Sequence, residues 1–264
     1  MCEPVIQNHY LLIFCMPCNK THDLFLNEQL KITQPSDGYR AATDPVFLAA
    51  SISAENGQSI LDIGSGVGVA SLCLGARIQG LSLHGIELQQ EYTFMAEANA
   101  IENNINFKVL NADLNNLPST FRQKSFDHVM TNPPFFIPST LSKPLRLEKS
   151  TANIETIPLA DWISISLKRL KSGGSFSIIH LTERLPEILS SLSISCGSIS
   201  VLPIVARKSR PAKRIIVQCI KGSKGPLKLL DPFIVHDGDM HNGDKSDYSK
   251  KANDILRLGH ALVL

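Results

Sequence analysis

The sequence lacks a segment that would cross a membrane or direct export. Its N-terminal apolar run, Tyr10 to Met16, is shorter than a membrane span. The residues ahead of that run include Glu3 but no Lys or Arg, whereas a signal peptide begins with a basic stretch. We therefore expect a protein that is neither exported nor membrane-bound, and we place it in the cytoplasm.

Cysteine is also scarce, with six residues in a chain of 264. These residues are too few and too scattered for a disulfide framework, and Cys73, Cys196 and Cys219 each stand alone in an apolar run, where small buried thiols are common. The lone pair Cys15 and Cys18 has no further ligands spaced nearby, so we expect no metal site. This pattern favours a reducing compartment.

Neither Gly, Pro nor Ser is in excess, and the hydrophobic (43%) and charged (19%) fractions are ordinary for a folded globular chain. The net charge of +2 hides an asymmetry, because residues 207–228 contain eight Lys or Arg and no Asp or Glu. Such a basic tract suits a polyanion. A solvated basic edge on two strands is an equally open alternative.

From residue 59 onward, apolar strand-like runs alternate with helical patterns. The expected strands are Ser59 to Ile63, Leu81 to Glu87, Asn106 to Leu110, Ser125 to Thr131 and Ser175 to His180. The expected helices are Val67 to Ile78, Gln90 to Glu102, Leu159 to Leu170 and Glu183 to Leu192. This alternation predicts an α/β fold with a parallel sheet.

Both ends of the chain depart from this alternation. Strands at Ser198 to Ala206 and Lys213 to Lys221 flank a turn, and we expect them to form an antiparallel pair at the sheet edge. Before residue 59 we expect short strands around Leu24 to Ile32, then a helix that begins near Asp44, with this Asp as its cap and Pro in the first helical position. The segment Asp247 to Leu258 is typical of an amphipathic helix.

A glycine-rich turn follows the first strand of the alternating region. Its sequence, Leu61-Asp62-Ile63-Gly64-Ser65-Gly66-Val67-Gly68, places an acidic residue at the end of the strand and glycines at alternating positions before a helix. Glycine is needed where the backbone turns tightly and approaches a ligand closely. The G-x-G-x-G spacing differs from the dinucleotide pattern G-x-G-x-x-G, and it leaves room for an uncharged amino acid tail rather than a pyrophosphate. The candidate cofactor-binding residues of this turn are Asp62, Gly64, Gly66 and Gly68.

Two further acidic residues follow the next strands. Glu87 ends the second strand, at the position where doubly wound folds bind ribose hydroxyls, and we expect it to accept hydrogen bonds from them. Asp113 follows the third strand and is well placed to accept a hydrogen bond from the amine of a cofactor's adenine. The alternative for Asp113 is an Asp that only begins a turn. The joint occurrence of strand, loop, helix, strand and Glu87 makes the cofactor interpretation specific.

A second motif, Thr131-Asn132-Pro133-Pro134-Phe135-Phe136, follows the fourth strand, at the edge where open α/β sheets bind ligands. The two prolines stiffen this loop. The Asn132 amide oxygen and the Pro133 carbonyl can then accept both hydrogens of one planar NH2 group, while Phe135 stacks on the base that bears it. A rigid turn without chemistry is the alternative. The candidate catalytic residues are Asn132, Pro133, Pro134 and Phe135, and Asn132 is also a candidate for cofactor contact.

With these motifs the chain resembles the class I S-adenosylmethionine methyltransferases, and among them the bacterial adenine N6-methyltransferases that act on valine tRNA beside the anticodon. The likeness runs from about Thr21 to the C-terminus, and Asn132 to Phe135 match the family's NPPF loop in full. The resemblance implies a doubly wound, seven-stranded, mostly parallel sheet of Rossmann-like type with an antiparallel edge strand. It also implies S-adenosylmethionine as the cofactor and RNA, most directly a tRNA, as the substrate.

The resemblance further implies that the segment before the first sheet strand lies over the cofactor, where Tyr39, Arg40 and Asp44 would close the methionine end of the pocket. We accordingly expect residues 21–58 to form a cap over the cofactor site and residues 59–264 to form the methyltransferase domain. Residues 1–20 have no counterpart in the family pattern. A mistaken early start codon would explain this N-terminal extension.

Two other functions stay open at this point. A methyltransferase acting on protein glutamine would use the same Asn132 loop to hold an amide, but relatives with that activity usually carry Tyr where this chain has Phe135. The basic tract also favours RNA. A protein that has kept the cofactor fold but lost turnover, serving as an RNA chaperone or assembly factor, would have no use for an intact Asn132 loop.

Overall fold

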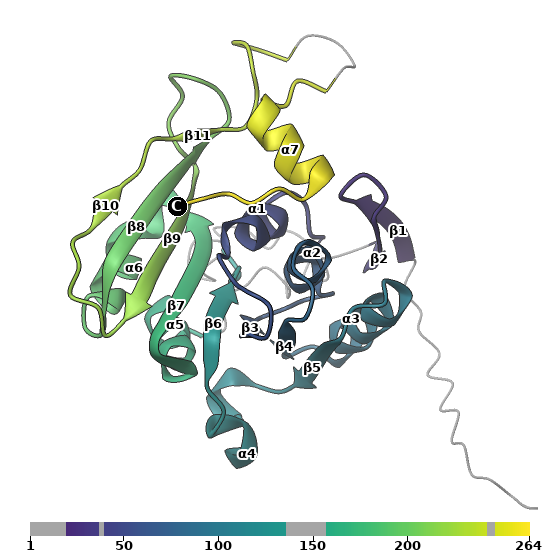
Figure 1. The fold of residues 1–264 in the computed structure, drawn as a ribbon, viewed down its shortest axis with the longest axis vertical. Coiled ribbons are helices and arrows are strands. Elements are labelled where there is room, and N and C mark those ends of the chain that lie inside the picture. Colours follow the sequence, from purple (N-terminus) through teal and green to yellow (C-terminus); the bar gives the residue numbers. More distant parts are fainter. Residues whose placement is uncertain (1–19, 37–39, 136–156, 242–245) are drawn as a thin grey trace, which may run out of the picture.

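The computed structural model describes residues 20–36, 40–135, 157–241 and 246–264. Within these ranges, helices cover both faces of one open sheet, and a two-stranded hairpin lies beside the helices of one face (Figure 1). Cys15, Cys18 and Tyr39 lie outside the described residues. Among the described helices, none combines the length and the apolar character that crossing a membrane requires.

The described part of the main sheet has nine strands rather than the expected seven, because two short strands add to it. In chain order they are β3 (Ser59–Ile63), β4 (Ser82–Glu87), β5 (Phe107–Asn111), β6 (Phe126–Thr131), β7 (Leu170–Leu181), β8 (Cys196–Val205), β9 (Arg214–Lys221), β10 (Lys228–Leu229) and β11 (Phe233–Ile234). Across the sheet the order is β5, β4, β3, β6, β7, β9 and β8, and the short strands β10 and β11 both pair with β8. All pairings except those of β9 are parallel, which confirms the predicted mostly parallel α/β sheet.

The antiparallel strand β9 lies between β7 and β8 rather than at the outer edge. Strands β8 and β9 form the predicted antiparallel pair, but β8 is the outer partner. Helix α6 (Leu185–Leu192) carries the chain past β7, so that β8 lies two positions away and β9 returns into the place between them. The sequence alone does not distinguish the two orders, because both keep β8 and β9 paired with each other.

Two hydrophobic cores lie on opposite faces of the sheet. Neighbouring residues of β3 separate into them, since Ile60 belongs to one core and Leu61 to the other. Burial of both faces explains why these strands are nearly continuous apolar runs. The helices that contribute to the first core are α1 (Asp44–Ser51), α2 (Val69–Arg77), α3 (Gln90–Glu102) and α7 (Lys250–Leu258). Those of the second are α4 (Ser119–Arg122), α5 (Leu159–Lys168) and α6.

Most predicted boundaries agree with the structure to within a few residues, and α3 has the predicted bounds. Helix α7 begins later than Asp247, because Ser249 caps it by accepting the Ala252 N–H at 3.2 Å, while the Asp247 carboxylate pairs with Arg207. The prediction that Asp44 caps α1 is wrong. Thr43 is the cap residue, and Asp44 is the first helical residue.

The N-terminal hairpin consists of β1 (Lys20–Phe25) and β2 (Leu30–Pro35), whose connecting turn falls inside the predicted range Leu24 to Ile32. Asn99 of α3 fastens this hairpin, because its amide accepts the Thr33 N–H at 2.8 Å and donates to the Thr33 carbonyl at 3.0 Å. The same amide donates at 3.0 Å to the carbonyl of Val67, which belongs to the glycine-rich turn of residues 64–68, the glycine loop. The hairpin is thereby fixed beside the glycine loop.

Candidate active site

The carboxyl ends of three adjacent parallel strands meet at one edge of the sheet. Strand β3 pairs with β4 on one side and with β6 on the other. Asp62 is the penultimate residue of β3, Glu87 is the last residue of β4, and Asn132 follows the last residue of β6. Topology therefore brings these three predicted residues to the same edge.

Thr131 and Trp162 fix the end of β6 against β3. The Thr131 hydroxyl donates to the carbonyl of Ile63 at 2.7 Å and accepts from the Trp162 indole N–H at 2.9 Å. The indole also lies against the glycine loop, since a Cβ on Gly64 would come within 2.9 Å of Trp162 Cζ2. Because Gly64 has a φ of +71°, both backbone conformation and space require glycine here.

The remaining glycines of the loop have different roles. The Gly64 N–H donates to the carbonyl of Ile86 at 2.9 Å, which closes the turn against β4. A Cβ on Gly68, the residue before α2, would come within 3.1 Å of the Phe107 ring, whereas a Cβ on Gly66 would meet no protein atom within 4 Å. Gly68 thus permits helix packing, and Gly66 borders open space.

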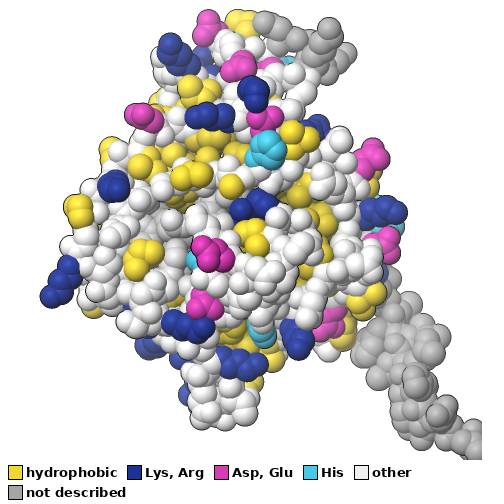
Figure 2. All heavy atoms as spheres, viewed as in Figure 1, with side chains coloured by type: hydrophobic (Ala, Val, Ile, Leu, Met, Phe, Trp, Pro, Cys, Tyr) yellow, Lys and Arg dark blue, Asp and Glu magenta, His cyan; other side chains and the backbone are white. Residues whose placement is uncertain are grey.

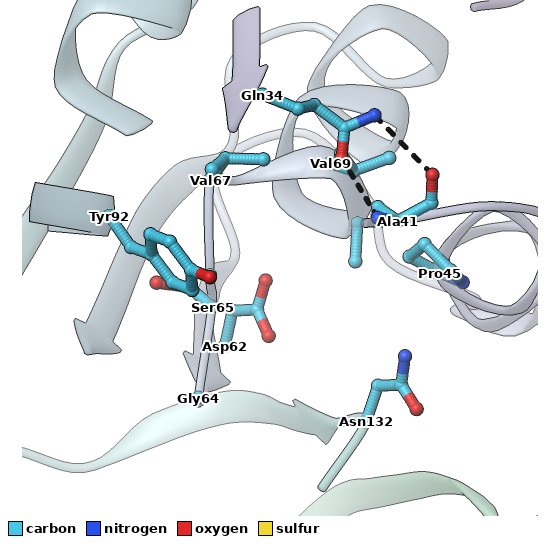
Figure 3. Close-up of a pocket in the computed structure, with 12 residues that line it drawn as sticks. Gln34, Ala41, Pro45, Asp62, Gly64, Ser65, Val67, Val69, Tyr92 and Asn132 are labelled. Atoms are coloured by element: carbon cyan, nitrogen blue, oxygen red, sulfur yellow. Dashed lines mark hydrogen bonds between the residues drawn. The ribbon is translucent and has the colours of Figure 1, made fainter. Parts of the chain in front are cut away.

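A hollow of about 440 Å³, measured out to the open solvent, lies among the glycine loop, the start of α2 and Asn132 (Figure 3). In Figure 3 the Asp62 carboxylate and the Asn132 amide project into the same open space from β3 and from the end of β6. The lining residues are Gln34, Ala41, Pro45, Asp62, Gly64, Ser65, Gly66, Val67, Val69, Ala70, Tyr92 and Asn132.

Glu87 is buried behind the glycine loop and does not belong to the lining residues. One carboxylate oxygen accepts the Gly66 N–H and the other accepts the Gln89 N–H, both at 2.9 Å. Burial raises the pKa of the Glu87 carboxyl, and these backbone donors act against that rise. A carboxylate has about four acceptor sites, so the predicted acceptance of a ribose hydroxyl is chemically open to it beside these backbone donors. That contact stays a prediction.

Asp62 lies in the wall of the hollow and is 2% exposed. Its carboxylate accepts from the Ser71 hydroxyl at 2.9 Å. Burial raises the pKa of the Asp62 carboxyl to about 7; the hydrogen bond from Ser71 opposes this rise, and the negative charge of Glu87 adds to it. Near neutral pH the carboxyl is therefore only partly ionised, and a cation bound in the hollow would favour its ionised form.

Asp113 is not among the lining residues. Its carboxylate accepts the Asn115 N–H at 2.9 Å and caps the 3₁₀ turn η1 (Leu114–Asn116). This is the geometry of an Asp that begins a turn, one of the two alternatives for this residue. Its contact with an adenine amine stays a prediction.

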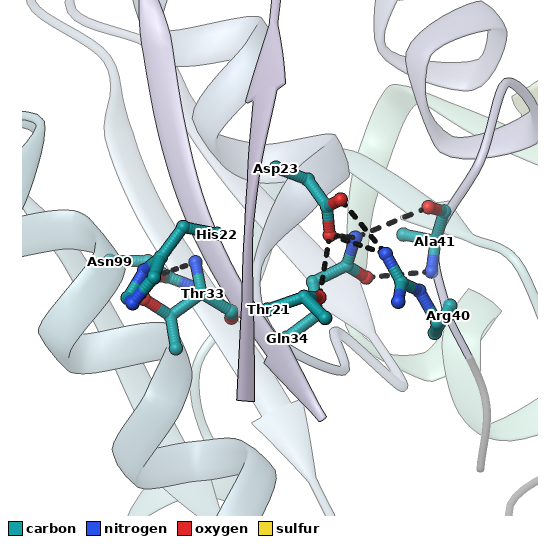
Figure 4. A network of polar contacts seen from close by, with 8 residues as sticks. All are labelled: Thr21, His22, Asp23, Thr33, Gln34, Arg40, Ala41 and Asn99. Atoms are coloured by element: carbon teal, nitrogen blue, oxygen red, sulfur yellow. Dashed lines mark hydrogen bonds and ion pairs between the residues drawn. The ribbon is translucent and has the colours of Figure 1, made fainter. Parts of the chain in front are cut away.

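Arg40 pairs with the hairpin and does not line the hollow (Figure 4). Its guanidinium donates to both carboxylate oxygens of Asp23 at 2.8 Å. The buried Gln34 joins the same network, because it donates to Asp23 at 3.0 Å and accepts the Ala41 N–H at 2.8 Å. Since Ala41 lines the hollow, the network shapes its wall, whereas a direct contact of Arg40 with a cofactor stays a prediction.

Asp44 does not line the hollow, and its contact with a cofactor stays a prediction. It takes part in a cluster beside the loop that follows β6. The Arg214 Nε donates to Asp44 at 3.0 Å, and the guanidinium lies over the Phe135 ring, 4.6 Å from its centroid. The His180 ring also packs on Phe135. The centroids of the two rings are 5.1 Å apart, and their planes make an angle of 63°. Pro45, the residue after Asp44, lines the hollow. The cluster therefore connects the wall of the hollow to the Phe135 loop.

Several residues of this site were not predicted from the sequence. His180 ends the strand expected beside β6, so the carboxyl-end rule that identified Asn132 would also have identified it. Arg214 was counted only as one charge of the basic tract. Trp162 carries no local signal, since its partner Thr131 lies 31 residues away in the sequence. The partners of Gln34, Asp23 and Ala41, are closer in the sequence, but only the folded hairpin brings them together.

Comparison with known proteins agrees with this geometry. The pattern of the family described as "Methyltransferase small domain" matches residues 42–190. A Porphyromonas gingivalis protein named tRNA1(Val) (adenine(37)-N6)-methyltransferase is 30% identical over 174 residues, which are 63% of this chain and 68% of the relative. A protein of the same name from Actinobacillus pleuropneumoniae is 26% identical over 223 residues, 81% of this chain and 90% of the relative. The crystal structure of a predicted O-methyltransferase from Agrobacterium tumefaciens shares the fold, with a TM-score of 0.67 at 22% identity over 84% of this chain and 99% of that chain.

Replacing Asp62 by Asn is expected to stabilise the ligand-free protein in a pH-dependent way. In the folded protein the Asp62 carboxyl has a pKa of about 7, whereas in the unfolded chain its pKa is near 3.8. At a pH between these two values, the folded protein therefore keeps a proton that the unfolded chain has released. Wild-type stability therefore falls as pH rises through this window, and it levels off above it. Urea unfolding should show an advantage of Asp62→Asn that is larger at pH 8 than at pH 5 by about 2 kcal/mol. An equal difference at both pH values would contradict this origin.

Replacing Gly66 by Ala is expected to weaken S-adenosylmethionine binding about tenfold or more while the fold persists. The new Cβ would strain a residue with φ of +54° and stand at the wall of the hollow. Trp162, the chain's single Trp, lies against the glycine loop. The affinity for S-adenosylmethionine can therefore be measured from the change in Trp162 fluorescence as the cofactor is added. Gly57→Ala is the matched control, because Gly57 has φ of +87°, equally open surroundings and no place in the hollow. Equal affinities for Gly66→Ala and Gly57→Ala would contradict the proposed site.

Proposed function

We propose that this chain, which belongs to the Methyltransferase small domain family and is an S-adenosylmethionine-dependent methyltransferase, methylates the exocyclic N6 amine of an adenine in RNA. We assign the RNA as a tRNA and the adenine to the region of its anticodon, because the relatives that match most of the chain carry that activity in their names. The observation on which the proposal rests is the position of Asn132, in the wall of the hollow that Gly64 and Gly66 also line.

The residues of the hollow fit the methyl donor. Gly66 leaves open space where a side chain would stand, and Asp62 supplies a buried carboxyl that gains from a cationic neighbour. Glu87 holds the glycine loop through the Gly66 N–H and has acceptor capacity left for a hydroxyl. We assign Asp62, Gly64, Gly66 and Glu87 to cofactor binding. When bound, S-adenosylmethionine supplies a methyl group on a positively charged sulfur.

The acceptor side is held by the loop after β6. Thr131 clamps the strand end, and the two prolines that follow Asn132 limit the backbone to few conformations. The Asn132 amide oxygen and the Pro133 carbonyl accept the two hydrogens of a planar amine and so direct its lone pair out of the plane of the base. Alignment and electrostatics then account for most of the rate.

This mechanism needs no strong base near the amine. His180 is buried, and burial together with the charges of Arg184 and Arg214 lowers the pKa of its imidazole to about 3. The imidazole is therefore neutral and a poor proton acceptor near neutral pH. The proton of the amine leaves after methyl transfer, when the nitrogen has become acidic.

The cap is part of the proposal. Ala41 and Pro45, from the predicted cap of residues 21–58, line the hollow together with residues of the domain 59–264. A cytoplasmic location follows from an RNA substrate and is consistent with free thiols at Cys73, Cys196 and Cys219.

Three members of the basic tract are used inside the protein. Arg207 pairs with Asp247, and Arg214 pairs with Asp44. The Lys221 ammonium donates to two backbone carbonyls, each at 2.7 Å. These three side chains are therefore not assigned to RNA.

The exposed members of the tract separate into two groups. Lys208, Arg210 and Lys213 lie in the turn between β8 and β9, at the carboxyl edge that also carries the Asn132 loop. Lys224 and Lys228 follow the opposite end of β9. On the face shown in Figure 2, Lys and Arg side chains are dispersed among acidic and apolar ones rather than gathered. We assign RNA phosphate contacts to the turn.

Asn132→Ala is expected to lower methyl transfer about 100-fold or more while S-adenosylmethionine affinity changes less than about threefold, because the lost amide acts on the acceptor. The measurement incubates labelled S-adenosylmethionine with total RNA from a strain that lacks the protein, and mass spectrometry identifies the methylated nucleoside. Asn253→Ala, an exposed change on α7, is the control. Wild-type turnover in Asn132→Ala would refute the proposed role.

The same assay separates the acceptor classes. N6-methyladenosine in tRNA is the expected product. Label in protein with unlabelled RNA would support glutamine methylation instead, since an amide also presents a planar NH2. RNA binding without any transfer would support the non-catalytic alternative.

The RNA affinity of the wild-type protein is expected to fall steeply with added salt, because phosphate contacts release counterions. Lys213→Ala should weaken RNA binding and reduce the slope of log affinity against log salt by about one. Lys224→Ala, at the opposite end of β9, should retain the wild-type slope. Filter binding at several salt concentrations measures both. Identical slopes for wild type and Lys213→Ala would show that the turn is only a solvated surface.

A further inference from the structure

Arg214 differs from the other basic residues of its tract in what it contacts. Its Nε donates to the Asp44 carboxylate at 3.0 Å, and its guanidinium lies over the Phe135 ring, 4.6 Å from the centroid. The side chains of the ion pair are only 31% and 25% exposed. Both the charge and the planar face of Arg214 are therefore already used within the protein, which distinguishes it from the exposed Lys213.

His180 supports the same ring from β7. The ring of His180 is 0% exposed and packs at a steep angle against Phe135. The Leu181 N–H donates to its Nδ1 at 2.8 Å, so the proton of the neutral imidazole is on Nε2. A buried imidazole that stays neutral and is held by the backbone is a fixed surface for packing rather than a titrating group.

The strand register makes this arrangement rigid. Strand β9 places Arg214 opposite Leu181 of β7, the residue after His180. Strand β7 pairs in turn with β6, whose end leads into the loop of Asn132 and Phe135. Asp44, at the start of α1, adds a contact from the side of the hollow that Pro45 lines. Two strands thus each supply a side chain that contacts the Phe135 ring, and α1 holds one of these side chains through Asp44.

We propose that Arg214 is a positioning residue for methyl transfer, which, held by Asp44, fixes the Phe135 ring and thereby sets where the acceptor base lies relative to Asn132. This inference rests on the proposed function, because Phe135 is the residue assigned to stack on the base. Arg214 covers one face of the Phe135 ring, so that face is not available to a stacked base. Arg214 acts through Phe135 and is not an RNA phosphate contact.

The variant that tests this is Arg214→Lys, which keeps the positive charge but loses the planar fork. An ammonium is a point charge and cannot pair with Asp44 and cover the Phe135 ring at the same time. A phosphate contact would survive this substitution almost unchanged. We expect kcat for the RNA to fall about tenfold or more, with S-adenosylmethionine affinity and the salt dependence of RNA affinity as in the wild type.

A double-mutant cycle tests whether Arg214 acts through Phe135. In the Phe135→Leu background, adding Arg214→Lys is expected to change kcat by less than about twofold, since the ring that Arg214 positions is absent. Lys224→Ala, which removes a charge of the same tract at the far end of β9, is expected to have wild-type kinetics and serves as the control. Fully additive effects of the two substitutions would overturn the proposal.

Crystal structures provide a readout that needs no acceptor. The Phe135 ring is expected to be displaced in Arg214→Lys relative to the wild type. A ring in the same place, or a kcat for the RNA equal to that of the wild type, would overturn the positioning role. Failure of the proposed function is a separate result, because it would appear as absence of RNA methylation in the wild-type protein, and the ring position would still decide the role of Arg214.

Discussion

The parallel pairing of β3 with β4 on one side and with β6 on the other is the constraint on which the site depends. It places the residues that end these strands at one edge, where Asp62, Glu87 and Asn132 come from segments far apart in the chain. The Thr131 hydroxyl, which bridges the Ile63 carbonyl and the Trp162 indole, makes that edge rigid. The positions of the hollow, the glycine loop and the loop of Asn132 all depend on this alignment.

Charge is distributed unequally across the hollow. On the cofactor side, two buried carboxyl groups, Asp62 and Glu87, have raised pKa values because they are withdrawn from water. Beside the loop of Asn132 and Phe135, the charge of Asp44 is balanced by Arg214. A bound cation would stabilise the ionised form of the two carboxyl groups. At the Phe135 ring, by contrast, the charges of Asp44 and Arg214 cancel. Asp62 therefore lowers folding stability once its carboxyl ionises, and a cation bound in the hollow would offset that loss.

Much of this arrangement could be predicted from the sequence. Alternating apolar runs determine the α/β fold, and the rule that ligands meet the carboxyl ends of strands identifies Asp62, Glu87 and Asn132. Those signals are local, because each depends on a strand and the few residues after it. They give no information on the place of β9, since its position depends on how far α6 carries the chain.

Contacts between distant segments could not be predicted in the same way. The pairing of Arg40 with Asp23 was not predicted, because only the folded hairpin places that carboxylate next to it. Asp44 was expected to cap a helix, yet Arg214, 170 residues away, binds its carboxylate. The residues next to Arg40 and Asp44 in the sequence do not indicate which side chain each of them binds. The same reason explains why the support of Phe135 by His180 and Arg214 is visible only in three dimensions.

A crystal structure of the protein with S-adenosylhomocysteine tests the central claim most directly. The quantity to measure is the distance between the sulfur of the bound product and the side chain of Asn132. We predict that the product fills the hollow, with its sulfur close enough to Asn132 for a methyl group and an amine to lie between them. Product bound elsewhere, or with its sulfur directed away from the loop after β6, would contradict a shared site for donor and acceptor.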